Sequence, residues 1–337
     1  MCVPGVILGV SGISETDRKD EDAVANVFWT VNLRKDIRHI LHVIKCKILY
    51  ENRVTPALYR LGCNLHLFTP YVIIYVDGGI CSQMHQYLLG RYYAEKGYHV
   101  AYDIGWYARN GKDNNGIHSR IFEFPQLWPD LPIEIASSKL IAFYSRVFPA
   151  KRNGMHFPLP ITPPIYLQGY YFFDDEREYG AMYQRYFDVE SAVKMEKSSL
   201  ITDWPGTKCA VHVRRGDLAQ MNDVFYGKVT VDYFRQAISY VTNHFENVKF
   251  FFFSDGIEWV EENLFEFYKD FPYVLVRGNC AYEDLNLMTH CDCFISSQGS
   301  AGKFAAMMNG KGLLIVSGDP HDVVWMERFN NTIVIDP

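Results

Sequence analysis

The 337-residue sequence has no run that approaches the ~18 consecutive apolar residues of a membrane-spanning helix. Its opening stretch, MCVPGVILGVSG, lacks the positively charged start of a signal peptide and is soon followed by ETDRKDEDA. Internal repeats and low-complexity tracts are also absent. We therefore expect a cytoplasmic protein that makes at most peripheral contact with the inner face of a membrane.

Cysteine pairs with metal-binding spacing are missing as well. None of the eight cysteines belongs to a CxxC pair, and Cys291 and Cys293 form a CxC arrangement without a histidine cluster nearby. A zinc site is therefore not expected. The scattered cysteines fit free thiols in a reducing compartment better than they fit a disulfide framework.

An excess of positive charge is also missing, because 39 acidic residues outnumber 33 Lys and Arg residues and give a formal net charge of −6. General nucleic-acid binding needs a basic surface, so this class of function is not expected, although one local basic pocket is compatible with the balance. Aromatic residues are numerous, at 15%. They suit either the stacking of sugars on rings or large aromatic cores.

The length allows one large or two medium domains, and the texture of the sequence changes at about residues 70 and 200. Residues 1–70 form an N-terminal extension with an amphipathic helix. Its apolar face is made of Leu33, Ile37, Ile40, Leu41, Ile44 and Ile48. Such a helix covers a core or, because Arg34, Lys35 and Arg38 lie off that face, contacts an anionic membrane or a lipid-linked substrate.

Residues 71–200 begin with a β-loop-α-β unit. The apolar run 71–76 predicts a buried strand that ends at Asp77, and residues 83–96 predict a helix before the strand GYHVAYD. The side chains expected to point inward from this helix are Met84, Tyr87, Leu88 and Tyr92. The stretches PQLWPDLP and FPLPITPPIYLQGYYFFDD, rich in proline and aromatics, predict loops and short segments.

Residues 201–337 alternate strands with helices. Strand-like runs such as KCAVHV, VKFFFFSD, DCFISS and GLLIVSG are separated by helical patterns. This alternation predicts an α/β fold with a doubly wound parallel sheet.

Three of these strands end in polar stretches, HVRRGD, FFSDG and ISSQGSAGK, and ligands of open parallel sheets bind beyond such ends. Arg214 and Arg215 offer planar donor forks for phosphate oxygens. The loop 296–302 offers hydroxyls, glycines that allow close approach, and a helix N-terminus, but not the spacing of a P-loop. Together they predict a diphosphate site. A local ion pair between Arg215 and Asp217 is the alternative for those two residues.

The stretch HVRRGD resembles the HxRRxD motif of the fucosyltransferases that use GDP-fucose, above all the α-1,2-fucosyltransferases of glycosyltransferase family 11. Three more stretches are similar to that family and occur in its order. VDGGICSQMHQYLLGRYYAEKGYHVAYDIGWY is similar to its glycine-rich opening, and FFFFSDGIEWVEENL to its SDxxxW segment. YEDLNLMTHCDCFISSQGSAGKFAAMMN is similar to its DLxLMxxC segment and the Ser-rich loop that follows. The resemblance covers roughly residues 71–320.

The sequence departs from the family pattern at three places. Cys81 and Ser82 stand where the family has Gly-Asn, and His85 stands where an aromatic residue follows. The loop Ser-Ser-Gln-Gly-Ser-Ala-Gly replaces the usual Asn-Ser-Thr-Phe-Ser-Trp-Trp. This loop and CSQMHQ look closer to the α-1,6-fucosyltransferases, so the departures leave the linkage open more than the donor.

The resemblance implies an inverting transferase of the GT-B type, with two Rossmann-like lobes and a cleft between them. Residues 71–200 would be the acceptor-side lobe and residues 201–337 the lobe that binds the GDP-sugar. L-Fucose would pass from GDP-β-L-fucose to a hydroxyl of an oligosaccharide or lipid-linked glycan, such as O2 of galactose in a surface-glycan or O-antigen precursor. No metal or other cofactor is implied, and the D-x-D at 20–22 lies outside the similar stretches.

Several residues take roles by this resemblance. Arg214 would hold the β-phosphate and stabilise the departing GDP, and His212 would orient it. Asp284 matches the carboxylate that reads guanine, and Ser300 with its neighbouring backbone would bind phosphate. The further donor-site candidates are Arg215, Asp255, Ser297, Gln298, Gly299 and, at the rim, Gly79 and Gln83.

Inversion needs a base near the acceptor hydroxyl or a largely dissociative mechanism. Asp217 is the candidate within the motif, and Asp223, Asp103 and His85 remain alternatives, although Asp103 and Asp77 also suit the capping of strand ends. Three other functions stay open: α-1,6 or α-1,3 fucosyl transfer, transfer from another GDP-sugar, and sugar or nucleotide binding without catalysis.

Overall fold

The computed structural model describes residues 37–38, 54–112, 116, 119–151, 162–169, 175–190, 192–216 and 229–336. Its contacts divide the chain into two units, residues 1–68 and 69–337. The first unit contains the helix α2 (Val54–Asn64). Of the amphipathic stretch expected over residues 33–53, Ile37 and Arg38 are described and both are helical. The rest of that prediction lies outside the described residues.

The second unit contains two sheets in which all strands run parallel, so the predicted α/β fold class is confirmed. The first sheet has the strand order β2-β1-β4-β3. Its strands are β1 (Tyr71–Tyr75), β2 (His99–Asp103), β3 (Pro149–Lys151) and β4 (Ile165–Gln168). The helix α3 (Ile80–Glu95) connects β1 to β2, as predicted. All four of its expected inward side chains are buried.

The rest of this part of the chain contains helices of 3 to 11 residues, for which no bounds were predicted from the sequence. The helices are α4 (Gly105–Arg109), α5 (Phe124–Leu127), α6 (Ser138–Val147), α7 (Glu176–Tyr186), the 3-10 turn η2 (Glu196–Ser198) and α8 (Ser199–Thr202). The strand β4 was not predicted, because it lies within the proline-rich stretch expected to form loops and short segments, and yet it pairs with both β1 and β3. Its first three side chains are buried, so it is a core strand of the sheet.

The second sheet has the order β10-β9-β8-β5-β6-β7 and is doubly wound, as predicted. Its strands are β5 (Lys208–Val213), β6 (Lys249–Ser254), β7 (Tyr273–Leu275), β8 (Cys293–Ser296), β9 (Leu313–Ser317) and β10 (Thr332–Ile335). Its helices are α10 (Val231–His244), α11 (Ile257–Tyr268), α12 (Ala281–Met288), α13 (Ser300–Asn309), α14 (Pro320–Val323) and α15 (Trp325–Arg328). The chain builds outward from β5 in one direction and from β8 in the other, which places the reversal of strand order between β5 and β8.

Strand β5 shows how the two faces of this sheet differ. Val211 and Val213 pack into a core with α10 and α11, whereas Ala210 belongs to the core on the opposite face. Side chains alternate along a strand, so His212 also points to the face of Ala210. This is the face that α13 covers, because a Cβ at Gly302 of α13 would lie 2.9 Å from the Cβ of His212.

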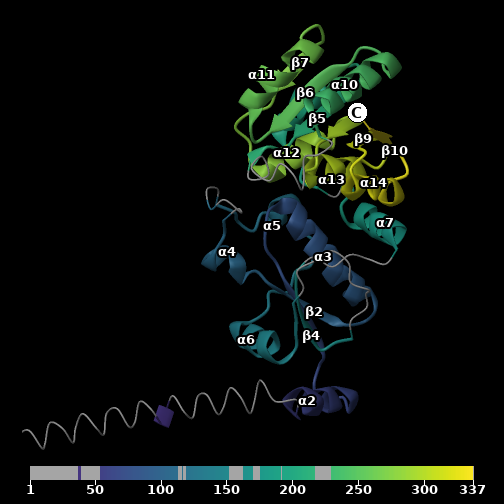
Figure 1. Ribbon diagram of the computed structural model, residues 1–337. Coiled ribbons are helices and arrows are strands. Elements are labelled where there is room, and N and C mark those ends of the chain that lie inside the picture. The colour runs from purple at the N-terminus through teal and green to yellow at the C-terminus, as the bar shows by residue number, and fades with distance from the viewer. Residues whose placement is uncertain are drawn as a thin grey trace, which may run out of the picture. The chain divides into compact units, whose positions relative to one another are not determined.

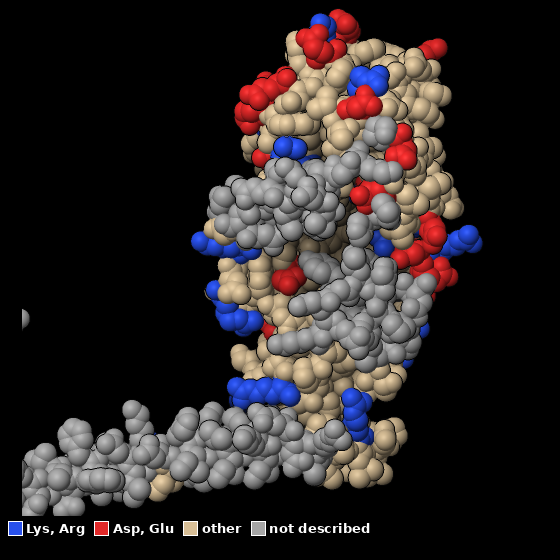
Figure 2. Space-filling model, in the orientation of Figure 1, with Lys and Arg blue, Asp and Glu red and all other residues tan. Residues whose placement is uncertain are grey.

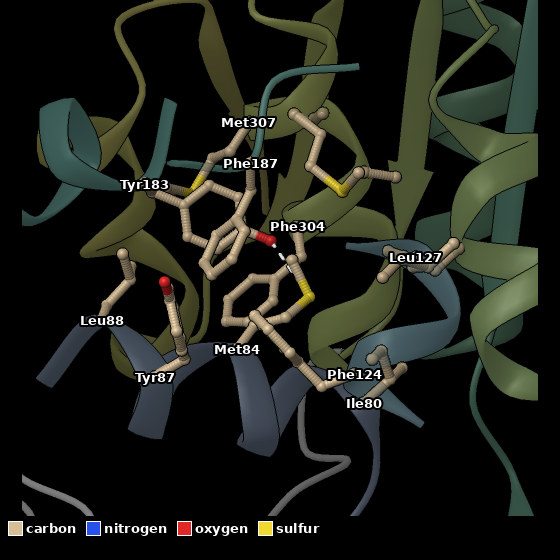
Figure 3. Packing of buried hydrophobic residues seen from close by; sticks show 14 of the residues in the cluster. Ile80, Met84, Tyr87, Leu88, Phe124, Leu127, Tyr183, Phe187, Phe304 and Met307 are labelled. Atoms are coloured by element: carbon tan, nitrogen blue, oxygen red, sulfur yellow. Dashed lines mark hydrogen bonds between the residues drawn. The ribbon is translucent and has the colours of Figure 1, made fainter. Parts of the chain in front are cut away.

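The core on that face joins the two sheets into one unit. It contains side chains of α3, α5 and α7 together with those of α13, as Figure 3 shows. The ring centres of Phe304 and Tyr183 are 4.9 Å apart, and the Tyr183 hydroxyl donates to the sulfur of Met84 at 3.6 Å. In Figure 1, α7 accordingly lies beside α13 although the two helices are distant in sequence. This packing fixes α13 against helices that belong to the first sheet.

Charges of both signs are spread over the face seen in Figure 2, and acidic side chains gather over the end that carries α11. That helix contributes Glu258, Glu261, Glu262 and Glu266. Within the described residues, no helix is both long and apolar enough to cross a membrane.

Phe304 tests the shared core. Phe304→Ala should lower the free energy of unfolding by about 3–5 kcal/mol, because it leaves a cavity between α13, α7 and α15. Urea denaturation followed by circular dichroism would measure this change. Phe265→Ala is the matched control, since Phe265 is 40% exposed on α11, and its loss should be less than half as large. Equal losses in the two variants would contradict a core role for Phe304.

Candidate functional site

His212, Arg214 and Ser297 meet where the strand order of the six-stranded sheet reverses. Strands β5 and β8 are parallel neighbours, with His212 opposite Ser296. The Ser297 N–H donates to the carbonyl of His212 at 3.0 Å, and the Arg214 N–H donates to the Ser297 hydroxyl at 2.8 Å. Connections leave such a point in opposite directions, so it is the usual place for a ligand of an open parallel sheet.

The Arg214 guanidinium forms an ion pair with Asp255, which follows β6. The two side chains remain 23% and 28% exposed, respectively. The second oxygen of Asp255 accepts the Arg215 N–H at 2.6 Å. Asp255 therefore orients both the side chain and the backbone of the HVRRGD stretch, and it leaves the Arg214 guanidinium within reach of solvent.

Arg215 points toward a different part of the sheet. The central carbon of its guanidinium lies 4.5 Å from the ring centre of Trp259 on α11, a cation–π arrangement. The structure thus places Arg214 beside α13 and Arg215 over α11. The two guanidinium groups that were predicted to bind phosphate therefore point in different directions.

Two glycines let α13 approach β5 closely. A Cβ at Gly299 would lie 2.8 Å from His212 Cε1 and 2.9 Å from Arg214 Cβ. A Cβ at Gly302 would lie 2.9 Å from both His212 Cβ and Ser296 Oγ. Contacts this short require the absence of a side chain, so the glycines hold the helix N-terminus directly against His212 and Arg214.

The environment of His212 keeps its ring neutral. Burial, with the positive charges of Arg214 and Lys303, lowers its pKa from 6.5 to about 3. Its Nδ1 atom is buried and has no hydrogen-bond partner in the described part of the chain. At neutral pH the ring therefore has one N–H to donate and one nitrogen that accepts, beside a cationic guanidinium.

A buried ion pair, which was not predicted from the sequence, holds the loop before α13 in place. Lys303 and Asp322 are both about 2% exposed and bond to each other, and Lys303 also donates to the carbonyl of Gln298 at 3.3 Å. Asp322 accepts in addition from the hydroxyl of Ser317 at 2.8 Å. The available signal was a lysine inside the otherwise apolar run KFAAMM, which needs a buried partner.

The N-terminus of α13 has no side-chain cap, because its N-cap residue is Gly299. The side-chain oxygen of Gln298 is buried and has no hydrogen-bond partner among the described residues. Free N–H groups in a first helical turn favour an anion.

Gln83, a predicted rim residue, is fully occupied by the protein backbone. Its amide nitrogen donates to the carbonyls of Gly78 at 3.3 Å and Ile121 at 2.9 Å. Its amide oxygen accepts the N–H groups of Glu123 and Phe124, each at 2.9 Å. An amide can make four hydrogen bonds, so Gln83 is committed to tying the glycine-rich loop to the segment before α5.

The glycine-rich loop also comes close to the donor-site candidates of the second sheet. Cys81, in the first turn of α3, hydrogen-bonds to the Ser300 side chain, and burial raises the pKa of its thiol to about 12. The charges of Arg214 and Arg120 also act on this thiol. A Cβ placed at Gly79, two residues before Cys81, would lie 3.7 Å from a guanidinium nitrogen of Arg120. The helices α3 and α13 thus begin beside each other.

The other acidic and basic candidates divide into occupied and undescribed residues. The carboxylate of Asp103 is buried and accepts from the Gly105 N–H and the Tyr166 hydroxyl, both at 2.8 Å. The Nδ1 of His85 lies 3.1 Å from the hydroxyl of Tyr179, and this histidine is buried. Asp103 therefore has the strand-end role that the sequence left open. Asp217 and Asp223 lie outside the described residues.

Asp284 lies in the first turn of α12. It accepts a hydrogen bond from the side-chain amide of Asn279 at 2.9 Å. Burial, the dominant effect, raises its pKa to about 6. The start of α12 is fixed by Glu283, which accepts the Cys280 N–H at 2.7 Å and pairs with Lys197 at 3.0 Å. Asp284 is thus a rigidly mounted carboxylate that is ionised only above about pH 6.

Comparisons with known proteins agree on one class of enzyme. The chain is 29% identical over 123 residues to the alpha-1,2-colitosyltransferase of Escherichia coli, covering 35% of this chain and 41% of that protein. It is 31% identical over 110 residues to galactoside alpha-(1,2)-fucosyltransferase 2 of Gorilla gorilla gorilla, covering 32% of each. It is 32% identical over 111 residues to galactoside alpha-(1,2)-fucosyltransferase 1 of Homo sapiens, covering 32% of this chain and 30% of that protein. The matched segments thus span 30% to 41% of the length of these relatives.

The family assignment rests on a longer match. Residues 151–322, just over half of the chain, match the sequence family described as Glycosyl transferase family 11. This segment contains β5, β6 and β8 with the site at their ends. The chain belongs to glycosyltransferase family 11.

Proposed function

We propose that the protein transfers L-fucose from GDP-β-L-fucose to a hydroxyl of a glycan acceptor, with inversion at the sugar carbon and without a metal ion. The observation that carries this proposal is the meeting of Arg214, neutral His212 and the N-terminus of α13 at the reversal point of a parallel sheet. These groups are suited to a diphosphate, and the chain belongs to a glycosyltransferase family.

The names of these relatives agree on the linkage that is formed but differ in the sugar that is transferred. All three that are described above carry α-1,2 in their names, whereas one is named for colitose and two for fucose on a galactoside. We therefore propose α-1,2 transfer to galactose in an oligosaccharide or lipid-linked glycan as the first reaction to test. Other linkages and other GDP-linked deoxy sugars come next.

Arg214 would act on the leaving group. As the bond between the sugar carbon and the β-phosphate oxygen breaks, negative charge grows on GDP and positive charge on the sugar. A fixed guanidinium stabilises that growing charge more than it stabilises the bound donor, and such a contact raises turnover. Asp255 already holds this guanidinium in place, so little side-chain entropy is lost when the diphosphate binds.

His212 would contribute as a neutral donor. Its pKa of about 3 reflects two neighbouring cations and burial, so the ring does not add a third positive charge at neutral pH. An N–H from the ring can bond a phosphate oxygen, while the N-terminus of α13 supplies backbone N–H groups on the other side. Asp284, mounted on α12, would accept the two N–H donors on the edge of guanine.

Release of GDP from GDP-β-L-fucose over a panel of galactosides is the experiment that tests the proposal. We expect GDP release that depends on a galactoside, a product with α-1,2 linkage by NMR, and no loss of rate with EDTA. Calorimetric binding of GDP without turnover on any acceptor would contradict transfer and favour a binding protein. Strict dependence on Mn²⁺ would contradict the metal-free proposal.

Arg214→Ala should reduce kcat by about 100-fold or more, which is what loss of one charged transition-state contact costs. Arg214→Lys should recover part of that loss, because it keeps the charge but not the planar fork. Steady-state kinetics with saturating GDP-fucose would measure both. Arg277→Ala is the control, since Arg277 pairs with Glu258 and Glu261 at the surface and should leave kcat unchanged. Near-normal turnover in Arg214→Ala would remove Arg214 from the mechanism.

Asp284 makes donor binding depend on pH. A carboxylate must be ionised to accept both guanine N–H groups, and the Asp284 pKa of about 6 lies well above its ordinary value. Affinity should therefore be constant above about pH 7 and fall as pH drops below 6, by up to about tenfold per pH unit. Calorimetry with GDP-fucose would measure this, because its diphosphate does not titrate in that range.

Asp284→Asn should weaken binding at pH 7.5 by about 10- to 100-fold, since hydrogen bonds to charged groups contribute about 1.5–3 kcal/mol. It should also remove the pH dependence, whereas Asp270→Asn, an exposed change beyond α11, should behave as wild type. A melting curve establishes that each variant is folded. Wild-type affinity that does not change between pH 5 and 7 would contradict the assignment of Asp284 to guanine.

A further inference from the structure

Glu123 is an acidic residue in the part of the chain that contains the first sheet. None of the sequence patterns pointed to it. It immediately precedes α5, and its N–H is held by the Gln83 side chain at 2.9 Å. The residue is 9% exposed. One part of its carboxylate accepts the N–H of Ile80, in the first turn of α3. Glu123 is therefore anchored at the helix start that follows the glycine-rich loop.

The second carboxylate oxygen of Glu123 is unpaired among the described residues. Oε2 is buried and lacks a hydrogen-bond partner in the described part of the chain. Leaving a charged oxygen buried and unbonded is among the costlier arrangements in a protein interior. Capping α3 needs one oxygen only, so capping does not explain the other.

Glu123 acts electrostatically on residues at both ends of the proposed donor site. It acts electrostatically on Cys81, the thiol that bonds Ser300 and also senses Arg214. It acts in the same way on Tyr282, in the first turn of α12 beside the position of Asp284. α5 and α12 are in contact. Among the candidates for the base in the described residues, Asp103 has both oxygens engaged, whereas Oε2 of Glu123 has no hydrogen-bond partner.

The charge state of Glu123 is set by opposing neighbours. Burial is the largest effect and raises its pKa above the ordinary value, while Arg120 and the Ile80 N–H lower it. Glu123 also acts on Cys81 and Tyr282, and both are neutral at pH 7 because their ordinary pKa values lie above that pH and are raised further. A carboxyl group whose pKa moves toward neutrality is a better proton acceptor than an ordinary glutamate.

We propose that Glu123 is the general base of the transfer, with its carboxylate accepting the proton of the acceptor hydroxyl. This inference rests on the proposed function. The acceptor oxygen forms its bond to the sugar carbon, and the bond from that carbon to the β-phosphate oxygen breaks. The electron pair of the broken bond leaves with GDP toward Arg214, and the acceptor proton ends on Glu123.

Glu123→Gln separates this role from capping. Glutamine keeps an oxygen that can accept the Ile80 N–H but does not take up a proton. We expect kcat to fall by about 100-fold or more, the usual contribution of a positioned base, with donor affinity and melting temperature close to wild type. Glu123→Ala removes both functions and should lower the melting temperature as well. Glu134→Gln, an exposed change in the same part of the chain, is the matched control and should leave all three quantities unchanged.

The pH profile of kcat at saturating donor gives an independent readout. In wild type, kcat should fall as pH decreases through the Glu123 pKa, because the protonated acid cannot accept a proton. This acid limb should be missing from the residual activity of Glu123→Gln. A purely structural role would move the melting temperature but not the shape of the profile.

The outcomes distinguish this inference from the proposed function. If wild type shows no transfer from GDP-fucose to any acceptor, the proposed function fails first. If wild type is active and Glu123→Gln keeps kcat within about fivefold with an unchanged acid limb, the base assignment is wrong and Glu123 is a helix cap.

Discussion

The close approach of α13 to the end of β5 is the constraint on which the rest of this structure depends. Gly299 and Gly302 leave no side chain between the helix and His212, and the buried Lys303–Asp322 pair holds the helix in place. The same helix packs Phe304 against α7, a helix beside the first sheet. One short helix thus positions the strand end that is proposed to bind the diphosphate and, through the shared core, the glycine-rich loop.

Much of the second sheet could be predicted from the sequence because its signals are local. Runs such as KFFFFS are buried on both faces, and each is separated from the next by a helix, so the alternation alone defines a parallel sheet. The polar residues after β5 and β8 had to meet, since carboxyl ends of adjacent parallel strands share one edge. His212, Arg214 and Ser297 were therefore predictable as neighbours. β4 was not, because its four residues follow two prolines and its strand character arises only from pairing with β1 and β3.

What the sequence could not provide are contacts between distant segments. Asp255 was predicted at the site, but its pairing with Arg214 depends on the register of β6 against β5. The direction of Arg215 depends on Trp259, a residue of a helix on the other face. Glu123 carries no local signal at all, since RIFEFPQL reads as an ordinary loop; its position follows from Gln83 on α3, whose four hydrogen bonds bring that loop to the helix start.

The two sides of the site differ in their charged groups, and this difference suits the proposed ligands. On the side of the second sheet, Arg214 and Lys303 make protonation of His212 unfavourable, and each cation is paired with one carboxylate, Asp255 and Asp322 respectively. On the side of the first sheet, Arg120 offsets the buried Glu123 only in part, because the effect of burial is larger. An anionic leaving group would find a surplus of donors on one side, and a hydroxyl would find an unused acceptor on the other. This distribution of donors and acceptor suits the proposed displacement at the sugar carbon. The acceptor proton would move toward the first sheet, and the electron pair of the broken bond would move toward the second.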